Sequence, residues 1–111
     1  MKFIAVDMNN NTATNDGGGL YLTNGNSTAI NVLEYEWSDI GAMGANSAGG
    51  NGGGICLFNN AGNILIATVI TPNTQYNTES TIIGNTAVNG GGVYIENCAN
   101  VTLDFINMTF N

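Results

Sequence analysis

The sequence contains almost no basic side chains. Lys2 is its only lysine or arginine, histidine is absent, and charged residues of either sign make up 8% of the 111 residues. Eight acidic residues set the formal net charge at −7. Because a single base cannot neutralise the phosphates of a nucleic acid or of an anionic membrane, neither is an expected partner.

Proline, long apolar runs and helical periodicity are scarce as well. The chain has one proline, and no segment of ten or more residues shows a helical spacing of apolar residues. The apolar part of the N-terminal stretch MKFIAVDM is too short for a signal peptide and far too short to span a membrane. We therefore expect no membrane insertion; either a secretion signal lies elsewhere or the sequence is a fragment.

Glycine, asparagine and β-branched residues replace the usual helix formers. The chain has 16 glycines, and 43% of its residues are hydrophobic, which is enough to form a core. Short alternating runs rich in Val, Ile, Thr and Tyr recur along the chain. These features predict an all-β protein in which residues 1–111 form a single domain.

Two motifs recur together three times. Glycine triplets begin at Gly17, Gly52 and Gly90, with spacings of 52 − 17 = 35 and 90 − 52 = 38 residues. An apolar-x-x-Asn-[Thr/Ser]-Ala motif precedes each triplet, and an apolar-x-apolar run follows it. Self-similarity at this period predicts a solenoid, here a parallel β-helix of about three coils with roughly three short strands in each. The expected repeat units are residues 8–42, 43–81 and 82–111.

The two motifs have a physical role in such a fold. Coils of a β-helix stack about 4.8 Å apart, so residues at equivalent positions lie on one another. A turn with positive φ, or one in which backbones crowd, selects glycine in every coil. The expected structural-turn glycines are Gly17, Gly18, Gly19, Gly52, Gly53, Gly54, Gly90, Gly91 and Gly92. Asn11, Asn46 and Asn85 should form an asparagine ladder, with side-chain amides bonding from coil to coil or to the turn backbone.

Two segments interrupt the pattern. Residues 34–44 and 71–79 are expected to be irregular loop insertions between strands. An antiparallel sandwich with glycine-rich loops is the alternative fold, but independent loops have no reason to share a motif of this length. A calcium-binding roll is disfavoured because its glycine-rich nonapeptide does not recur.

The pairing of a Gly-Gly-[Gly/Ala]-apolar motif with a Phe-x-x-Asn motif resembles the extracellular repeats of the chlamydial polymorphic outer-membrane proteins. The resemblance covers nearly the whole chain through residues 17–22, 52–57 and 90–95 and the three asparagine motifs. The sequence departs from the family by a third glycine in each triplet and by Met or Ile where the family has an aromatic residue. The resemblance implies a right-handed parallel β-helix of the pectate-lyase-like superfamily and a surface-exposed, adhesive or structural role.

The expected function is that of a non-catalytic extracellular or cell-surface module. It would stack head to tail with identical subunits into a filament, or adjoin further repeats of the same protein. No enzyme activity, cofactor or metal is expected, because the acids occupy different coil positions and have no His or Arg beside them. The alternative is a carbohydrate-binding or carbohydrate-active β-helix, with Tyr35 and Trp37 as candidate ligand contacts.

Three further predictions concern the cysteines, the last residues and the candidate glycosylation sites. Cys56 and Cys98 are compatible with one disulfide or with two free thiols. The last residues, DFINMTFN, are expected to open another asparagine motif that stops before its asparagine. In a secreted glycoprotein, the candidate N-glycosylation sites are Asn10, Asn26, Asn100 and Asn107.

Overall fold

The computed structural model describes residues 1–26, 32–38, 41–69, 80–104 and 106–111. Within these residues the regular elements are all β-strands, as predicted. In chain order they are β1 (Lys2–Ile4), β2 (Thr12–Ala13), β3 (Leu20–Thr23), β4 (Leu33–Ser38), β5 (Ala42–Gly44), β6 (Ser47–Ala48), β7 (Ile55–Phe58), β8 (Asn63–Val69), β9 (Ser80–Ile83), β10 (Val93–Glu96), β11 (Asn100–Asp104) and β12 (Ile106–Thr109).

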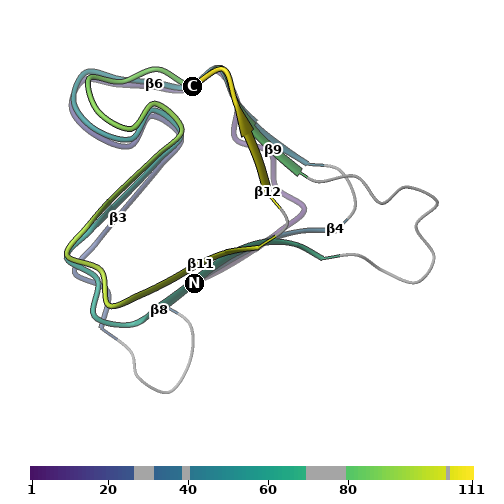
Figure 1. Ribbon diagram of the computed structural model, residues 1–111, viewed down its shortest axis with the longest axis vertical. Coiled ribbons are helices and arrows are strands. Elements are labelled where there is room, and N and C mark those ends of the chain that lie inside the picture. The colour runs from purple at the N-terminus through teal and green to yellow at the C-terminus, as the bar shows by residue number, and fades with distance from the viewer. Residues whose placement is uncertain (27–31, 39–40, 70–79, 105) are drawn as a thin grey trace.

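The strands form four parallel sheets, each of which joins successive coils. The sheet orders are β1-β4-β8-β11, β3-β7-β10, β5-β9-β12 and β2-β6. Figure 1 looks along the axis of the solenoid, and the coils follow nearly the same outline. From faded purple to yellow, the chain runs counterclockwise as it approaches the viewer, so the winding is right-handed. The predicted right-handed parallel β-helix is confirmed.

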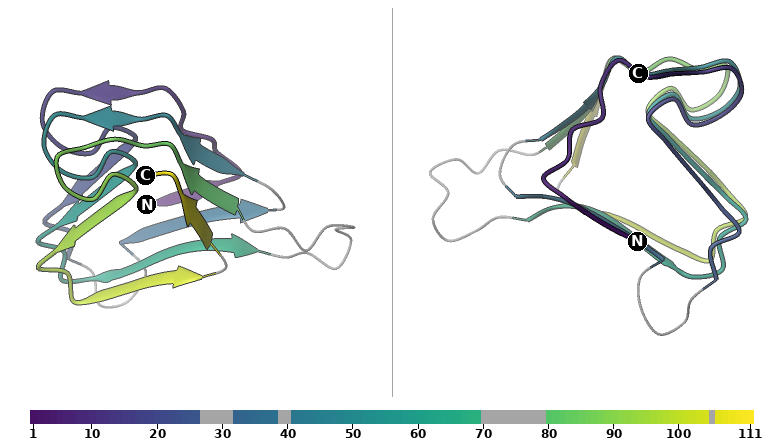
Figure 2. Two further views of the ribbon diagram at one scale, coloured as in Figure 1. Left: turned by 45° about the horizontal axis from the view of Figure 1, so that its top comes forward. Right: turned by 180° about the vertical axis from the view of Figure 1, so that it is seen from behind.

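Residues that follow the glycine triplets stack in one sheet. Ile55 pairs with Leu20 on one side and with Val93 on the other, both in parallel register. Figure 2 shows the corresponding strands of successive coils lying side by side along the axis. The repeats seen in the sequence therefore correspond to structurally equivalent positions, as stacking of coils requires.

Corners of the coils reuse a left-handed backbone conformation at equivalent positions. One residue with positive φ turns the chain sharply, and glycine and asparagine tolerate this conformation best. The residues before the motif asparagines have φ of 60°, 54°, 64° and 54°, at Asn10, Ala45, Gly84 and Phe110. The first triplet glycines have φ of 67°, 64° and 59°, at Gly17, Gly52 and Gly90. A third corner has φ of 56°, 54° and 51°, at Asn24, Asn59 and Asn97. These corners account for four of the 16 glycines and for four asparagines.

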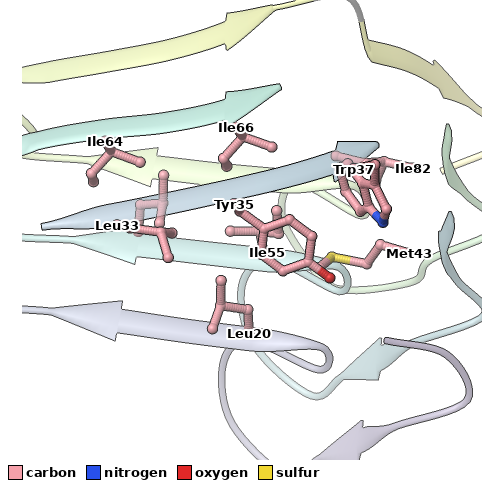
Figure 3. Packing of buried hydrophobic residues seen from close by; sticks show 10 residues of the cluster. Leu20, Leu33, Tyr35, Trp37, Met43, Ile55, Ile64, Ile66 and Ile82 are labelled. Atoms are coloured by element: carbon pink, nitrogen blue, oxygen red, sulfur yellow. The ribbon is translucent and has the colours of Figure 1, made fainter. Parts of the chain in front are cut away.

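The hydrophobic core fills the interior of the coils. β4 contributes Leu33, Tyr35 and Trp37 from alternate positions, and Figure 3 shows them beside side chains from neighbouring strands. The Tyr35 and Trp37 ring centroids lie 4.5 Å apart. The expected irregular insertion at 34–44 is therefore wrong for most of its length, because β4 and β5 run through it. The expected insertion at 71–79 lies outside the described residues.

Candidate functional site

Asn11, Asn46 and Asn85 lie one above another and are joined by hydrogen bonds. The Oδ1 of Asn46 accepts from the backbone N–H and the side-chain amide of Asn11, at 2.9 and 3.0 Å. The Oδ1 of Asn85 accepts from the same two groups of Asn46, at 3.0 and 2.9 Å. Each Nδ2 also donates backwards, from Asn46 to the Met8 carbonyl and from Asn85 to the Met43 carbonyl. The ladder therefore ties three coils together through side chains and backbone at once.

Asn111 is a fourth rung that was not predicted from the sequence. Its Oδ1 accepts from the backbone and the side chain of Asn85, at 3.0 and 2.9 Å, and its Nδ2 donates to the Ile82 carbonyl at 2.8 Å. Met108 pairs with Ile82, the first residue of the third motif. The expectation that the last motif stops before its asparagine is therefore wrong. The apolar-x-x-Asn spacing from Met108 to Asn111 was the signal for it.

The asparagine ladder, Asn11, Asn46, Asn85 and Asn111, has a direction. In each link between rungs the earlier asparagine donates, and the Oδ1 of the later asparagine accepts. Asn46 and Asn85 are fully buried, whereas both end rungs are exposed. No described residue donates to the Oδ1 of Asn11. One end of the helix thus presents an acceptor and the other presents donors, so the two end faces are complementary.

Glycine triplets meet two different physical requirements. Their first glycines have positive φ, as Gly52 does at 64°. The second and third have no room for a side chain: a Cβ on Gly53 would lie 2.4 Å from the Thr86 oxygen and 2.5 Å from the Gly91 oxygen. Backbone amides of the triplets bond from coil to coil, for example from Gly54 to Gly91 at 2.9 Å. The triplets are therefore sites of close backbone contact between coils.

The candidate ligand contacts Tyr35 and Trp37 lie inside the coils. Their exposed fractions are 0% and 1%. The Tyr35 hydroxyl and the Trp37 Nε1 both donate to the Val6 carbonyl, at 2.6 and 3.1 Å. Burial raises the pKa of Tyr35 above its usual range. This corrects the sequence-based expectation, because neither side chain is accessible to a ligand.

Both cysteines have free thiols. Cys56 lies between Tyr21 and Tyr94 on the outer face of its sheet, and these neighbours leave it 1% exposed. Burial raises the pKa of the Cys56 thiol to about 11. The Cys98 sulfur lies 3.6 Å from the Asn60 side-chain amide, which donates to it. Cys56 is thus a packed side chain with little thiolate at neutral pH.

Acidic side chains do not gather into a site in the described part of the chain. No group of three or more His, Cys, Asp or Glu among the described residues is placed to hold a metal ion. Lys2 contacts Glu34 at 2.5 Å and Glu36 at 3.2 Å, and its hydrogen bond lowers the pKa of Glu34.

A surface hollow of about 310 Å³ is lined by Asn15, Asp16 and Tyr21.

The candidate glycosylation sites are all on the surface. Their asparagines are exposed at Asn10, Asn26, Asn100 and Asn107. An exposed asparagine is required for a glycan, so the geometry is compatible with one at each position.

Comparison with known proteins returned no relative. No family model, curated protein or solved structure matches the chain. None of the elements in the described residues is a helix long and apolar enough to cross a membrane.

Proposed function

We propose that this chain is a non-catalytic structural or adhesive module of an extracellular or cell-surface protein, extended by further coils of the same kind. The observation that carries the proposal is the asparagine ladder, which runs through every coil and ends in complementary donor and acceptor groups. A solenoid stabilised mainly by contacts between neighbouring coils can be lengthened without a change in its design.

Apolar exposure at the C-terminal end face supports this proposal. Ile95 and Leu57 occupy the same position in successive coils, but Leu57 is covered on both sides and is 0% exposed. Ile95 is 44% exposed at the open edge of β10. Unpaired strand edges with apolar residues normally need a cover, and another coil would supply both backbone partners and apolar contacts.

Adjoining repeats would cover this face more completely than an identical chain. The sheet that contains β1 has four strands, whereas the sheet that contains β3 has three. A second copy that placed its β1 on β11 would therefore leave its β3 one strand away from β10. Coils continued along one chain leave no such gap. Head-to-tail stacking of identical subunits remains the second form of the proposal, with the asparagine ladder as its main contact.

The test compares the 111-residue chain with a Met108→Lys variant, because Met108 is 48% exposed at the open edge of β12, in the coil that an identical copy would contact. We expect the unchanged chain to associate as its concentration rises in sedimentation velocity, and the variant to stay monomeric because a charge now lies on the open edge. Equal urea midpoints would show that the variant is folded. A chain that stays monomeric, with amides of β10 and β11 as protected from hydrogen exchange as those of β7 and β8, would overturn the proposal.

Carbohydrate binding is a second candidate, favoured by the hollow at Asn15, Asp16 and Tyr21. Tyr21 is 46% exposed, and its ring lies beside an amide and a carboxylate that can bond sugar hydroxyls. Screening on a glycan array should then show binding by the chain and loss of binding in Tyr21→Ala. An array on which the chain and Tyr21→Ala give the same signals would remove this candidate.

A further inference from the structure

We propose that the outer side of the sheet β3-β7-β10 carries a binding groove for a glycan with free amino groups, a proposal that rests on the carbohydrate-binding candidate. The groove lies between two rows of side chains that follow the axis of the solenoid. The outer row comes from equivalent positions of the three strands and consists of Tyr21, Cys56 and Tyr94. The polar row comes from the residues just before the glycine triplets and consists of Asp16, Asn51 and Asn89.

The two rows lie on either side of the corner that begins each triplet. Gly17 follows Asp16 directly, and a Cβ on Gly17 would lie 2.6 Å from the Cβ of Tyr21. The surface hollow lined by Asn15, Asp16 and Tyr21 lies at this corner. In Figure 1 the lobe that contains β6 meets β3 at an inward bend of the outline, and successive coils repeat the bend. Burial, and then the charge of Asp16, raise the pKa of Cys56 to about 11, so the carboxylate lies near the floor of the groove.

The groove opens sideways from the axis of the solenoid. Exposed Tyr21 follows buried Leu20 in β3, and the alternation along a strand directs the outer row away from the core. Further coils before or after the described ones would add residues to both rows and would not cover them. The groove is therefore compatible with extension of the chain by further coils.

Asp16 gives the groove a carboxylate without a basic partner in the described part of the chain. Its Oδ1 accepts from the Asn51 backbone N–H at 2.7 Å, and no described residue donates to its Oδ2. Lys2 is the only lysine or arginine of the chain, and it contacts Glu34 and Glu36 on β4, in another sheet. With a net charge of −7, the protein would repel uronate and sulfated sugars and attract a cationic ligand.

Two tyrosines mark the groove at a spacing of two coils. Tyr21 is 46% exposed, and the hydroxyl of Tyr94 donates to the Glu96 carboxylate, so an acid lies beside each ring. Because coils stack about 4.8 Å apart, the two tyrosines lie about 10 Å apart along the axis, close to the length of two linked pyranose rings. A protonated sugar amine could contact a ring face and a carboxylate together at either position.

A glycan fits this groove better than a basic peptide. An extended peptide binds a sheet through a free strand edge, where it completes the backbone hydrogen bonds. The floor of this groove is the face of a sheet, and its strands already pair with one another. Along its wall the Asn89 amide donates to the Asn51 Oδ1 at 2.9 Å, and such amides can both donate to and accept from sugar hydroxyls. These features favour a glycan chain that lies along the axis.

The test measures binding by isothermal titration calorimetry in slightly acidic buffer, in which sugar amines are protonated. The probes are a glucosamine hexamer, its fully N-acetylated form and a galacturonate hexamer. We expect the glucosamine hexamer to bind about tenfold or more tightly than the acetylated form, because acetylation removes the charge, and the galacturonate hexamer not to bind. Equal affinities for the charged and acetylated forms would overturn the proposal. A lysine hexapeptide that bound as tightly as the glucosamine hexamer would also overturn it.

Two matched variants remove the same charge from different places. Asp104 is exposed on β11, outside the groove. Asp16→Asn keeps an Oδ1 for the Asn51 N–H and places in this coil the residue that the polar row has in the other two, so the fold should persist. Asp16→Asn should weaken binding of the glucosamine hexamer about fivefold or more, and Asp104→Asn less than about twofold. Equal effects of the two variants would overturn the proposal, because net charge alone would then account for binding.

Results on the glycan array separate this proposal from the carbohydrate-binding candidate. Binding of neutral glycans that is lost in Tyr21→Ala, without any preference for free amines, would support that candidate and overturn the amino-sugar proposal. An array on which no glycan binds would contradict both. Association of coils is measured separately by sedimentation, so its outcome does not depend on either result.

Discussion

Replacing Asn46 by alanine tests the central rung of the asparagine ladder. The Asn46 side chain is fully buried and makes four hydrogen bonds, two as acceptor from Asn11 and two as donor to Met8 and Asn85. Each such bond contributes a net of about 0.5–1.5 kcal/mol, and a buried partner left without one costs more. Asn46→Ala should therefore lower the free energy of unfolding by about 4 kcal/mol, much of the stability of a typical domain.

Asn11→Ala is the matched control at the exposed end of the same ladder. It removes only the side-chain bond to Asn46, while the Asn11 backbone N–H keeps its acceptor. We expect a loss of about 1 kcal/mol. Equilibrium urea unfolding gives the free energy of unfolding of both variants, with the fluorescence of Trp37 in the core as the signal. An unchanged slope of that free energy against urea concentration checks that unfolding stays two-state. Equal losses in the two variants would refute the reasoning, because the buried rung would then contribute no more than the exposed one.

Further predictions concern crowding at the glycines and reactivity of the thiols. Gly53→Ala should prevent stable folding, since its Cβ would lie 2.4 Å from a carbonyl oxygen. Gly84→Ala should cost only about 1–2 kcal/mol of unfolding free energy, because the position has positive φ but nothing closer than 4.0 Å; similar urea midpoints would contradict this contrast. Alkylation followed by mass spectrometry should modify Cys98 before Cys56, whose pKa of about 11 makes its reaction accelerate as the pH rises. Faster modification of Cys56 at neutral pH would be the contrary result.

The coil positions of the glycine triplets could be predicted because stacking exposes each of them to the same environment. Gly53 illustrates this: the oxygens that exclude a side chain come from Thr86 and from Gly91, its own equivalent in the next coil. A constraint imposed by one copy of a residue on the next must recur in every coil. Such constraints leave a repeated motif in the sequence, and the asparagine ladder follows the same logic.

The place of Trp37 was not predicted, although a signal for it was present. Leu33, Tyr35 and Trp37 alternate with Glu34 and Glu36, and the structure directs the apolar set inward and the acids outward. This period of two is typical of a strand with one buried face. The segment was expected instead to be an irregular insertion in the repeat, with Tyr35 and Trp37 as candidate ligand contacts.

Asn111 was not predicted as a rung because the last motif was expected to open at Phe110, whereas the structure places its first residue at Met108, in a coil shorter than the others. The motifs begin at Met8, Met43, Ile82 and Met108, so the coils measure 43 − 8 = 35, 82 − 43 = 39 and 108 − 82 = 26 residues. Most of the difference between the last two coils lies in one connection, because 10 residues separate β8 from β9 whereas one separates β11 from β12. Hydrogen bonding constrains the strands and the ladder in every coil but leaves the length of a connection free. In a solenoid of this kind, a motif at equivalent coil positions therefore locates the next coil better than does the number of residues between successive motifs.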